Sequence, residues 1–439
     1  MSQPARPFRD GESDDSAADD DDVLGHGFLP AGLATVAIAA SATIDEASPG
    51  VVVGRRRERL SLPETITLGQ PTVGDEELEA IRAVFESGWL SGAGPTCQAL
   101  EARFASEVAG TAHALATSNC GSALHLGLQV LGAGPGDEVI VGDYTFPATG
   151  HSVAWTGAKP VFADIRPDIW SADPAAVEAA ITPRTVGIVA VDVFGQPADF
   201  DELRAIADRH DLWLMEDAAC SAGATYKGRP AGSLADVATF SFHGRKGITA
   251  GEGGALTTDD AELAAHARKL HTYGIAPAIS REGSTDLPLP EFDEFGYNYR
   301  LSDLAAGVML AQLDRLPTLL ANRRRVAGWY AELLADVDQV TAPVALDDRE
   351  HPWQSYVVTL DHGVDRGAVA SHLRSNGVQC NFGTYASHLQ PVYGFSGTLP
   401  VSADLFRRHL AIPMHANLTE GEVERVVATL TDALAAARG

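Results

Sequence analysis

Residues 241–254, SFHGRKGITAGEGG, hold one of only four lysines in the 439-residue chain. Arginine accounts for the other 28 of the 32 basic residues. Arginine keeps its proton near neutral pH, whereas a buried lysine can lose it and become a nucleophilic amine. Lys246 follows a strand-like run and precedes a turn closed by Gly-Glu-Gly-Gly, which suits Schiff-base chemistry. A surface lysine in a glycine-rich loop is the alternative for this stretch taken alone.

Two further segments offer groups that could act with this lysine. SNCGSALH, residues 118–125, runs from a strand end through Gly121 and Ser122 into a helix, where free N–H groups can bind phosphate. An ordinary capped helix is the alternative here. LMEDAACSAG, residues 214–223, places Asp217 directly after an apolar run. Its carboxylate could hold a ring N–H⁺, bind a metal or cap a helix.

Taken together, the three segments match what pyridoxal phosphate (PLP) requires. The cofactor needs a phosphate anchor, a carboxylate for its pyridinium nitrogen and a lysine for its aldehyde. The four cysteines, in contrast, have no C-x-x-C spacing, which argues against a zinc knuckle or a disulfide scaffold and suits a reducing cytoplasm. We therefore expect a PLP site and no metal site.

The elements that must position these residues alternate between strand and helix. Apolar runs of strand length occupy residues 112–118, 137–146, 159–165, 185–195, 212–219 and 237–243, and helical patterns occupy 74–88, 97–109, 122–132 and 199–210. This alternation predicts an α/β fold with a mostly parallel sheet covered on both faces, and ligands in such sheets collect beyond the carboxyl ends of the strands.

The pattern changes after residue 316. A long helix at 322–337, a strand at 353–360 and helices at 365–377 and 420–437 indicate a smaller α+β domain. We expect three parts: an acidic N-terminal extension (1–60), a large PLP-binding α/β domain (61–305) and a small C-terminal α+β domain (306–439).

Charge limits the classes of partner. The net charge of −27 argues against nucleic acid and acidic membrane surfaces, because polyanions would be repelled. Residues 10–22 carry eight acidic side chains and no basic one, which predicts a solvated tail. The apolar segment 27–44 is too short for a confident membrane span, and its acidic flank does not fit a secretory signal. We expect a cytoplasmic protein.

Longer motifs give a closer comparison. GQPTVGDEEL, SGWLSGAGP, SNCGSALHLGL, GPGDEVIVGDYTFPAT, EDAACSAGATYKGRPAGSLADVATFSFHGRKGITAGEGGALTTDD, FGYNYRLSDLAAGVMLAQLDRL and IPMHANLT follow one another along the chain. In this order they resemble the DegT-type (DegT/DnrJ/StrS) family of sugar aminotransferases, which are PLP enzymes of fold type I. The resemblance runs from about residue 66 to the last helix.

The resemblance implies roles for the residues that match. Lys246 would carry the cofactor as a Schiff base and move a proton between it and the amino donor. Asp217 would pair with the pyridine nitrogen, while Phe146 would stack on the ring. The phosphate would be held by Gly121, Ser122 and Ser241.

The resemblance also implies a substrate side and a partner subunit. Asn298, in GYNYR, would reach the phosphate site of a neighbouring copy, which implies a homodimer with shared active sites. His388 and His415 resemble residues of small-domain loops near the substrate. Arg300 is our candidate for binding the carboxylate of the amino donor.

Three positions need separate comment. Cys220 stands where many family members have Gln or His bonded to the phenolic oxygen of the cofactor, and a thiol is a poor donor. Cys120 begins a phosphate loop that is Ser-Gly-Thr in many relatives and Cys-Gly-Ser here. His243 lies three residues before the lysine, and we interpret it as a packing or phosphate-side residue because the lysine is retained.

The implied activity is transfer of an amino group from glutamate or glutamine to a keto-sugar, with a nucleotide-linked sugar favoured. An aminotransferase of a cyclitol ketone, a PLP-dependent dehydratase or lyase, and a PLP-binding regulatory protein stay open. Some relatives with histidine at the lysine position are dehydratases, so Lys246 disfavours that alternative. A regulator would be indicated by loss of Lys246 or Asp217, and both are present.

Overall fold

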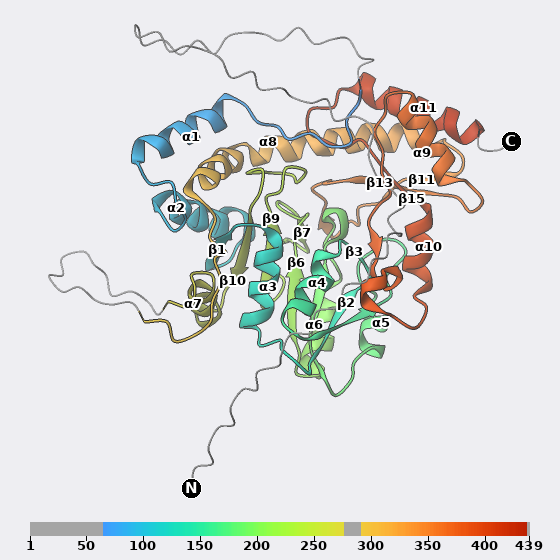
Figure 1. Cartoon of the computed structure of the whole chain (residues 1–439). Coiled ribbons are helices and arrows are strands. Elements are labelled where there is room, and N and C mark those ends of the chain that lie inside the picture. The colour runs from blue at the N-terminus through green and yellow to red at the C-terminus, as the bar shows by residue number, and fades with distance from the viewer. Residues whose placement is uncertain (1–64, 276–290, 437–439) are drawn as a thin grey trace, which may run out of the picture. The chain divides into compact units, whose positions relative to one another are not determined.

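The computed structural model describes residues 65–275 and 291–436, which lie in one compact unit, residues 61–439 (Figure 1). The predicted extension, residues 1–60, lies outside the described residues. The main sheet has seven strands in the order β1-β10-β9-β6-β5-β2-β4. Their bounds are His113–Thr117 (β1), Gly254–Thr258 (β10), Val237–Ser241 (β9), Trp213–Asp217 (β6), Thr185–Val191 (β5), Glu138–Gly142 (β2) and Lys159–Ala163 (β4).

The prediction of a mostly parallel α/β sheet is confirmed. The strands β9, β6, β5, β2 and β4 are parallel neighbours, and each of the six predicted apolar runs contains one strand of the main sheet. β10 was not predicted, and it pairs antiparallel with both β1 and β9. Most strand residues are buried, which is expected when helices cover both faces.

Six of the seven predicted helices agree with the structure to within a few residues, whereas the one predicted at 322–337 begins much earlier. The helices of the described residues are Asp75–Ser87 (α1), Pro95–Arg103 (α2), Cys120–Val130 (α3), Ala148–Trp155 (α4), Pro174–Ala179 (α5), Phe200–Arg209 (α6), Ala261–Leu270 (α7), Asp303–Leu334 (α8), Arg366–Ser375 (α9), Pro400–Arg408 (α10) and Glu420–Ala436 (α11). Helices α4, α5, α7 and α10 were not predicted. A π-helical turn, Phe104–Ala109, extends α2 and completes the predicted helix at 97–109.

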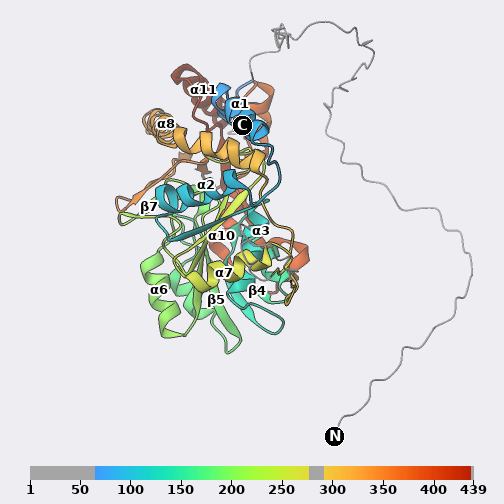
Figure 2. The same ribbon diagram turned by 90° about the vertical axis from the view of Figure 1, so that its left-hand side faces the viewer.

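Helix α8 links two hydrophobic cores. Its first half, including Leu313 and Leu316, packs with Phe240 of the main sheet. Its second half, including Val326 and Tyr330, packs with the C-terminal helices and strands. Figure 1 shows α8 running from α2 to α9 and α11, and Figure 2 shows the same helix after a turn of 90° about the vertical axis. The predicted helix at 322–337 is therefore the second half of a 32-residue helix that crosses the predicted domain boundary.

By length and composition, α8 could cross a membrane, and it is the one such helix found in the described residues. Half of its most apolar window is buried inside the fold, and a core helix of a soluble protein passes the same test. This helix is thus weak evidence for a membrane span.

The C-terminal part has its own sheet. Strands Val340–Thr341 (β11), Tyr356–Leu360 (β13) and His409–Ile412 (β15) pair antiparallel under α9 and α11. Two short ladders join this part to the main sheet region: Tyr385–Ala386 (β14) pairs with Tyr144–Thr145 (β3), and Arg349–Glu350 (β12) pairs with Thr225–Tyr226 (β7), which also pairs with Arg229–Pro230 (β8). The division at 60 and 305 stays a prediction.

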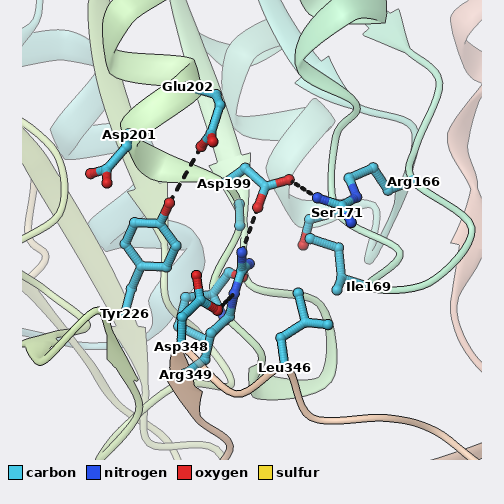
Figure 3. Close-up of polar contacts among 12 residues, drawn as sticks. Arg166, Ile169, Ser171, Asp199, Asp201, Glu202, Tyr226, Leu346, Asp348 and Arg349 are labelled. Carbon is cyan, nitrogen blue, oxygen red and sulfur yellow. Dashed lines mark hydrogen bonds and ion pairs between the residues drawn. The ribbon is translucent and has the colours of Figure 1, made fainter.

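A buried ion-pair cluster reinforces the second ladder (Figure 3). The carboxylate of Asp199 accepts hydrogen bonds from Arg349 on one oxygen and from Arg166 on the other. Arg349 also bonds Asp348 and stacks over the ring of Tyr226. The side chains of Arg349 and Asp199 are 2% and 6% exposed, so this pair is shielded from water. The cluster fixes the C-terminal part against the large sheet.

Candidate active site

The predicted site residues come together at one edge of the main sheet. In the strand register, Ser241 of β9 faces Gly254 of β10, and Gly254 faces Thr117 of β1. β6 lies beside β9 and ends at Asp217. The carboxyl ends of β1, β6 and β9 therefore lie together, and the loops that follow them carry the three predicted motifs.

The loop after β1 forms a cradle of backbone donors. Asn119 caps α3, and its side chain accepts a hydrogen bond from the backbone N–H of Ser122 (2.8 Å). In the part of the chain that the structure describes, no residue accepts a hydrogen bond from the backbone N–H of Cys120 or Gly121. These free N–H groups at the positive end of the helix dipole are suited to an anion.

Glycine is required where β10 passes beneath this cradle. A Cβ atom on Gly254 would lie 2.8 Å from both the carbonyl carbon of Asn119 and the nitrogen of Cys120, and 2.7 Å from the carbonyl oxygen of Phe240. All three are backbone atoms, so a side chain here would displace the start of α3. The absence of a side chain at this position lets the loop lie close to the sheet.

Lys246 differs from the three other lysines. Those three form ion pairs with carboxylates: Lys159 with Glu138, Lys227 with Asp201, and Lys269 with Asp293. The Nζ atom of Lys246 instead lies 3.1 Å from the Sγ atom of Cys220. Ser241 lines the same small cavity as Lys246 and Cys220, together with Pro352 and Gln354.

The turn that carries Lys246 is held by backbone hydrogen bonds. The N–H of Lys246 donates to the carbonyl of His243 (2.9 Å), and the N–H of Gly244 donates to the carbonyl of Gly251 (2.8 Å). Gly251 and Gly253 have φ angles of 84° and 151°, and residues with a side chain adopt such angles only at a cost in free energy. The φ angle of Lys246 is negative, so the lysine itself has an ordinary backbone conformation. The glycines thus take up the unusual backbone geometry of the turn.

Electrostatics favour the ammonium form of Lys246 when no ligand is bound. Burial lowers its pKa, but the interactions with the sulfur atoms of Cys220 and Cys120 and with the carboxylate of Asp217 outweigh burial and raise the pKa above its ordinary value. Any reaction that needs the neutral amine must therefore remove a proton from Lys246, and the surrounding sulfur and oxygen atoms oppose that loss because they stabilise the ammonium form.

Asp217 is buried and its carboxylate is oriented by two hydrogen bonds. Thr149, in the first turn of α4, donates its hydroxyl to Oδ2 (2.7 Å), and the backbone N–H of Ala219 donates to Oδ1 (3.2 Å). Burial raises the pKa of Asp217, while these bonds and the charge of Lys246 oppose the rise. The sequence analysis missed Thr149, although it lies in the quoted DYTFPAT motif and a threonine there can bond across the sheet edge.

Other predicted residues lie around this edge with more exposure. Phe146 follows β3, is 61% exposed and meets the ring of Tyr385 edge-on. Asn298 is exposed, and the segment that carries it runs beside the cradle, because Arg300 bridges to Thr117. The guanidinium of Arg300 lies over the ring of Tyr273.

The three predicted histidines have different environments. His388 is buried and its Nδ1 atom lies 2.6 Å from Asp143, so its ring holds a loop against β3. His415 is buried, its Nδ1 atom has no hydrogen-bond partner among the described residues, and burial lowers its pKa. His243 is partly exposed, and its Nδ1 atom accepts a hydrogen bond from the N–H of Arg245. None of these contacts assigns a ligand.

These groups fit PLP on the evidence of their geometry. Free N–H groups at the start of α3 can take a phosphate, a buried carboxylate is aimed by Thr149, and the Lys246 amine borders a cavity. Among the described residues, no cluster of three or more His, Cys, Asp or Glu could hold a metal ion.

Comparison with known proteins identifies the family. Residues 71–431 match the model of the DegT/DnrJ/EryC1/StrS aminotransferase family. The chain belongs to this family. Its enzyme class is therefore aminotransferase, and the family resemblance seen in the sequence is confirmed.

Three members of the family illustrate what this chain is similar to. The chain is 40% identical to GDP-perosamine synthase of Caulobacter vibrioides over 375 residues, which is 84% of this chain and 98% of that protein. It is 35% identical to DesI, solved in the presence of its TDP-sugar product, with a TM-score of 0.78 and coverage of 86% and 95%. The PLP form of Spr1654 from Streptococcus pneumoniae has a TM-score of 0.79 at 27% identity, with coverage of 85% and 99%.

Proposed function

We propose that this aminotransferase uses PLP to move an amino group from glutamate or glutamine to a keto-sugar linked to a nucleotide. The observation that carries the proposal is the convergence of Lys246, Asp217 and the start of α3 at one sheet edge. The GDP-linked and TDP-linked sugars named for two relatives support a nucleotide-linked acceptor. A cyclitol ketone is the alternative acceptor.

Each part of the site has a distinct task in this proposal. Gly121, Ser122 and Ser241 would hold the phosphate, and Phe146 would cover the ring. The carboxylate of Asp217 would face the pyridine nitrogen. When bound, PLP supplies an electron sink for a carbanion at the donor α-carbon.

Lys246 would carry the cofactor and exchange the proton at the donor α-carbon. The amine must be neutral to accept that proton, and its raised pKa keeps it protonated to higher pH than an isolated lysine. Asp217 carries a negative charge near the amine, so occupation of that carboxylate by a cationic ring would lower the pKa of Lys246. The site would thereby prepare its own base as the cofactor binds.

The remaining predicted residues complete the proposal. Asn298 would reach the phosphate of a neighbouring copy in a homodimer. His388, His415 and Arg300 would contact the amino donor or the sugar. We place the enzyme in the cytoplasm, without nucleic-acid or membrane partners.

Absorbance of the purified protein tests the cofactor and the lysine. We expect wild-type protein with added PLP to show a visible band that sodium borohydride abolishes as it fixes the cofactor covalently to Lys246, and Lys246→Ala to lack the band. Lys269→Ala, which removes a surface ion pair, should keep it. A visible band in Lys246→Ala equal to wild type would contradict the assignment of this lysine.

The same band tests the reaction. Glutamate or glutamine should bleach it, and a nucleotide-linked ketosugar should restore it. If no amino acid bleaches the band, a lyase or a regulatory protein becomes the better assignment of function. If only cyclitol ketones restore it, the acceptor class changes and the aminotransferase stands.

A further inference from the structure

Two of the four cysteines lie beside Lys246, although they are 100 residues apart in the sequence. Cys220 follows β6 and accepts a hydrogen bond from Lys246 at 3.1 Å. Cys120 starts α3, and its thiol is close enough to Cys220, Lys246 and Asp217 to interact with their charges. Histidine and glutamine, which many family members have at the position of Cys220, could not form this sulfur–amine pair.

The four cysteines differ in how reactive they can be. Burial raises the pKa of the thiols of Cys97, Cys120 and Cys380, which keeps those thiols protonated and poorly nucleophilic. Cys220 lines the cavity at the site and faces the Lys246 ammonium. A thiolate beside a cation in an accessible cavity is the form of cysteine that peroxides oxidise.

We propose that Cys220 is an oxidation site whose product is a covalent sulfur–nitrogen bond to Lys246. The geometry carries the proposal, since the two atoms lie 3.1 Å apart and border one cavity. Atoms held at about 3–3.5 Å are already near the distance at which a bond can form. The bond would remove the free amine of Lys246 and would be reversible by a thiol.

Hydrogen peroxide supplies the oxidising equivalents. In the first step the Cys220 thiolate attacks one peroxide oxygen, the S–O bond forms and the O–O bond breaks. The leaving hydroxide takes a proton from the Lys246 ammonium and becomes water, so the sulfur is oxidised by two electrons and the peroxide is reduced. This step leaves a sulfenic acid next to a neutral amine.

In the second step the Lys246 nitrogen attacks the sulfur. The S–N bond forms, the S–O bond breaks, and the departing hydroxide takes a proton from the nitrogen to give a second water. No further oxidant is consumed. A dithiol reductant then cleaves the S–N bond and returns the thiol and the amine.

Cofactor binding should protect the pair. A lysine engaged by PLP has no free amine to attack the sulfenic acid, so the link forms in protein whose Lys246 is free. This protection rests on the proposed function, whereas the link itself depends only on the sulfur–amine contact.

Peptide mass spectrometry of the full-length protein tests the proposal. Protein depleted of PLP is treated with hydrogen peroxide in slight molar excess and digested without reductant. We expect the peptides of Cys220 and Lys246 to appear joined, lighter than their sum by two hydrogen atoms, and to separate after dithiothreitol. Parallel loss of PLP binding, restored by dithiothreitol, should accompany the link.

Variants separate this link from general oxidation. Cys380→Ser, in the core of the C-terminal part, should form the link as wild type does, and Cys220→Ser should not. Unmodified Cys220, its direct conversion to sulfinic acid, or a Cys120–Cys220 disulfide as the product would each overturn the proposal. A link that forms equally with PLP present would leave the modification standing and contradict the assignment of Lys246 as the cofactor lysine.

Discussion

At the scale of single residues, two buried acids, Glu216 and Asp192, lie next to Asp217. Glu216 precedes it on β6, and Asp192 follows β5 and donates its backbone N–H to the carbonyl of Asp217. One carboxylate oxygen of each, Oε1 of Glu216 and Oδ2 of Asp192, is buried and has no hydrogen-bond partner in the part of the chain that the structure describes. A single proton shared between these oxygens would satisfy both.

Burial supports that arrangement. It raises the pKa of Asp192 to about 7 and that of Glu216 well above its usual range. The charge of Asp192 raises the pKa of Glu216 further, whereas a hydrogen bond from Glu216 partly offsets the rise at Asp192. The pair therefore retains a proton near neutral pH. A native pKa above the unfolded value of 3.8 means that the contribution of Asp192 to stability is largest at low pH and falls as the pH rises to about 7.

Glu216→Gln should remove this pH dependence. The amide oxygen still accepts from the N–H of Gly232, and the amide NH₂ can donate to Asp192. We expect the variant to exceed wild type in unfolding free energy at pH 8 by about 1 kcal/mol, with a smaller gain at pH 5. Urea unfolding at both pH values measures it, with Glu86→Gln on exposed α1 as control. Parallel pH profiles for the variant and wild type would contradict a shared proton.

At the scale of elements, β10 decides how the phosphate cradle sits on the sheet. It runs antiparallel between β1 and β9, and Gly254 lies where the loop before α3 crosses it. The cradle therefore depends on a strand that contributes no side chain at that point. The same strand begins directly after the turn that carries Lys246, so the lysine and the cradle share one support.

Gly254→Ala should loosen the cradle. The added Cβ must displace backbone atoms of Asn119 and Cys120, which we expect to cost roughly 1–3 kcal/mol of stability and to weaken PLP binding about tenfold or more. Titration of PLP by absorbance measures the binding. Gly328→Ala, at an exposed position of α8 where nothing lies within 4 Å, should leave binding unchanged and raise stability by up to ~1 kcal/mol. Equal effects of both substitutions would contradict a local role for Gly254.

At the scale of the whole molecule, the C-terminal part is tied to the sheet by the Asp199 cluster and by α8. Asp199→Asn leaves Arg349 buried with its main counter-charge removed. We expect a loss of about 3 kcal/mol in unfolding free energy, because an unpaired buried charge is costly. Asp168→Asn removes a more exposed partner of Arg166 and should cost less than about 1 kcal/mol. Guanidinium unfolding of the two variants should rank them in this order.

The proposed dimer gives a test through mixed subunits. If Asn298 acts on the neighbouring copy, a dimer of Lys246→Ala with Asn298→Ala regains one complete site. Random mixing of two inactive variants should then recover about a quarter of the wild-type sites. Activity that stays at the level of the separate variants after unfolding and refolding the mixture would place Asn298 in its own site.

Local sequence determined much of this protein. The apolar runs specified six strands of the main sheet. Residues 118–125 specified a helix start with backbone N–H groups suited to an anion, and the scarcity of lysine singled out Lys246. These features depend on residues that are neighbours in the chain. Their order along the chain was also sufficient to recognise the family.

Only the tertiary structure decided which distant groups meet. The sequence could not predict the direction of β10, because a short buried strand has the same composition whether it runs parallel or antiparallel. The bond from Thr149 to Asp217 and the contact between Lys246 and Cys220 arise from strand order and packing across 68 and 26 residues of chain. Spacing in a sequence carries no such information, because side chains separated by whole strands and helices are brought together by the sheet.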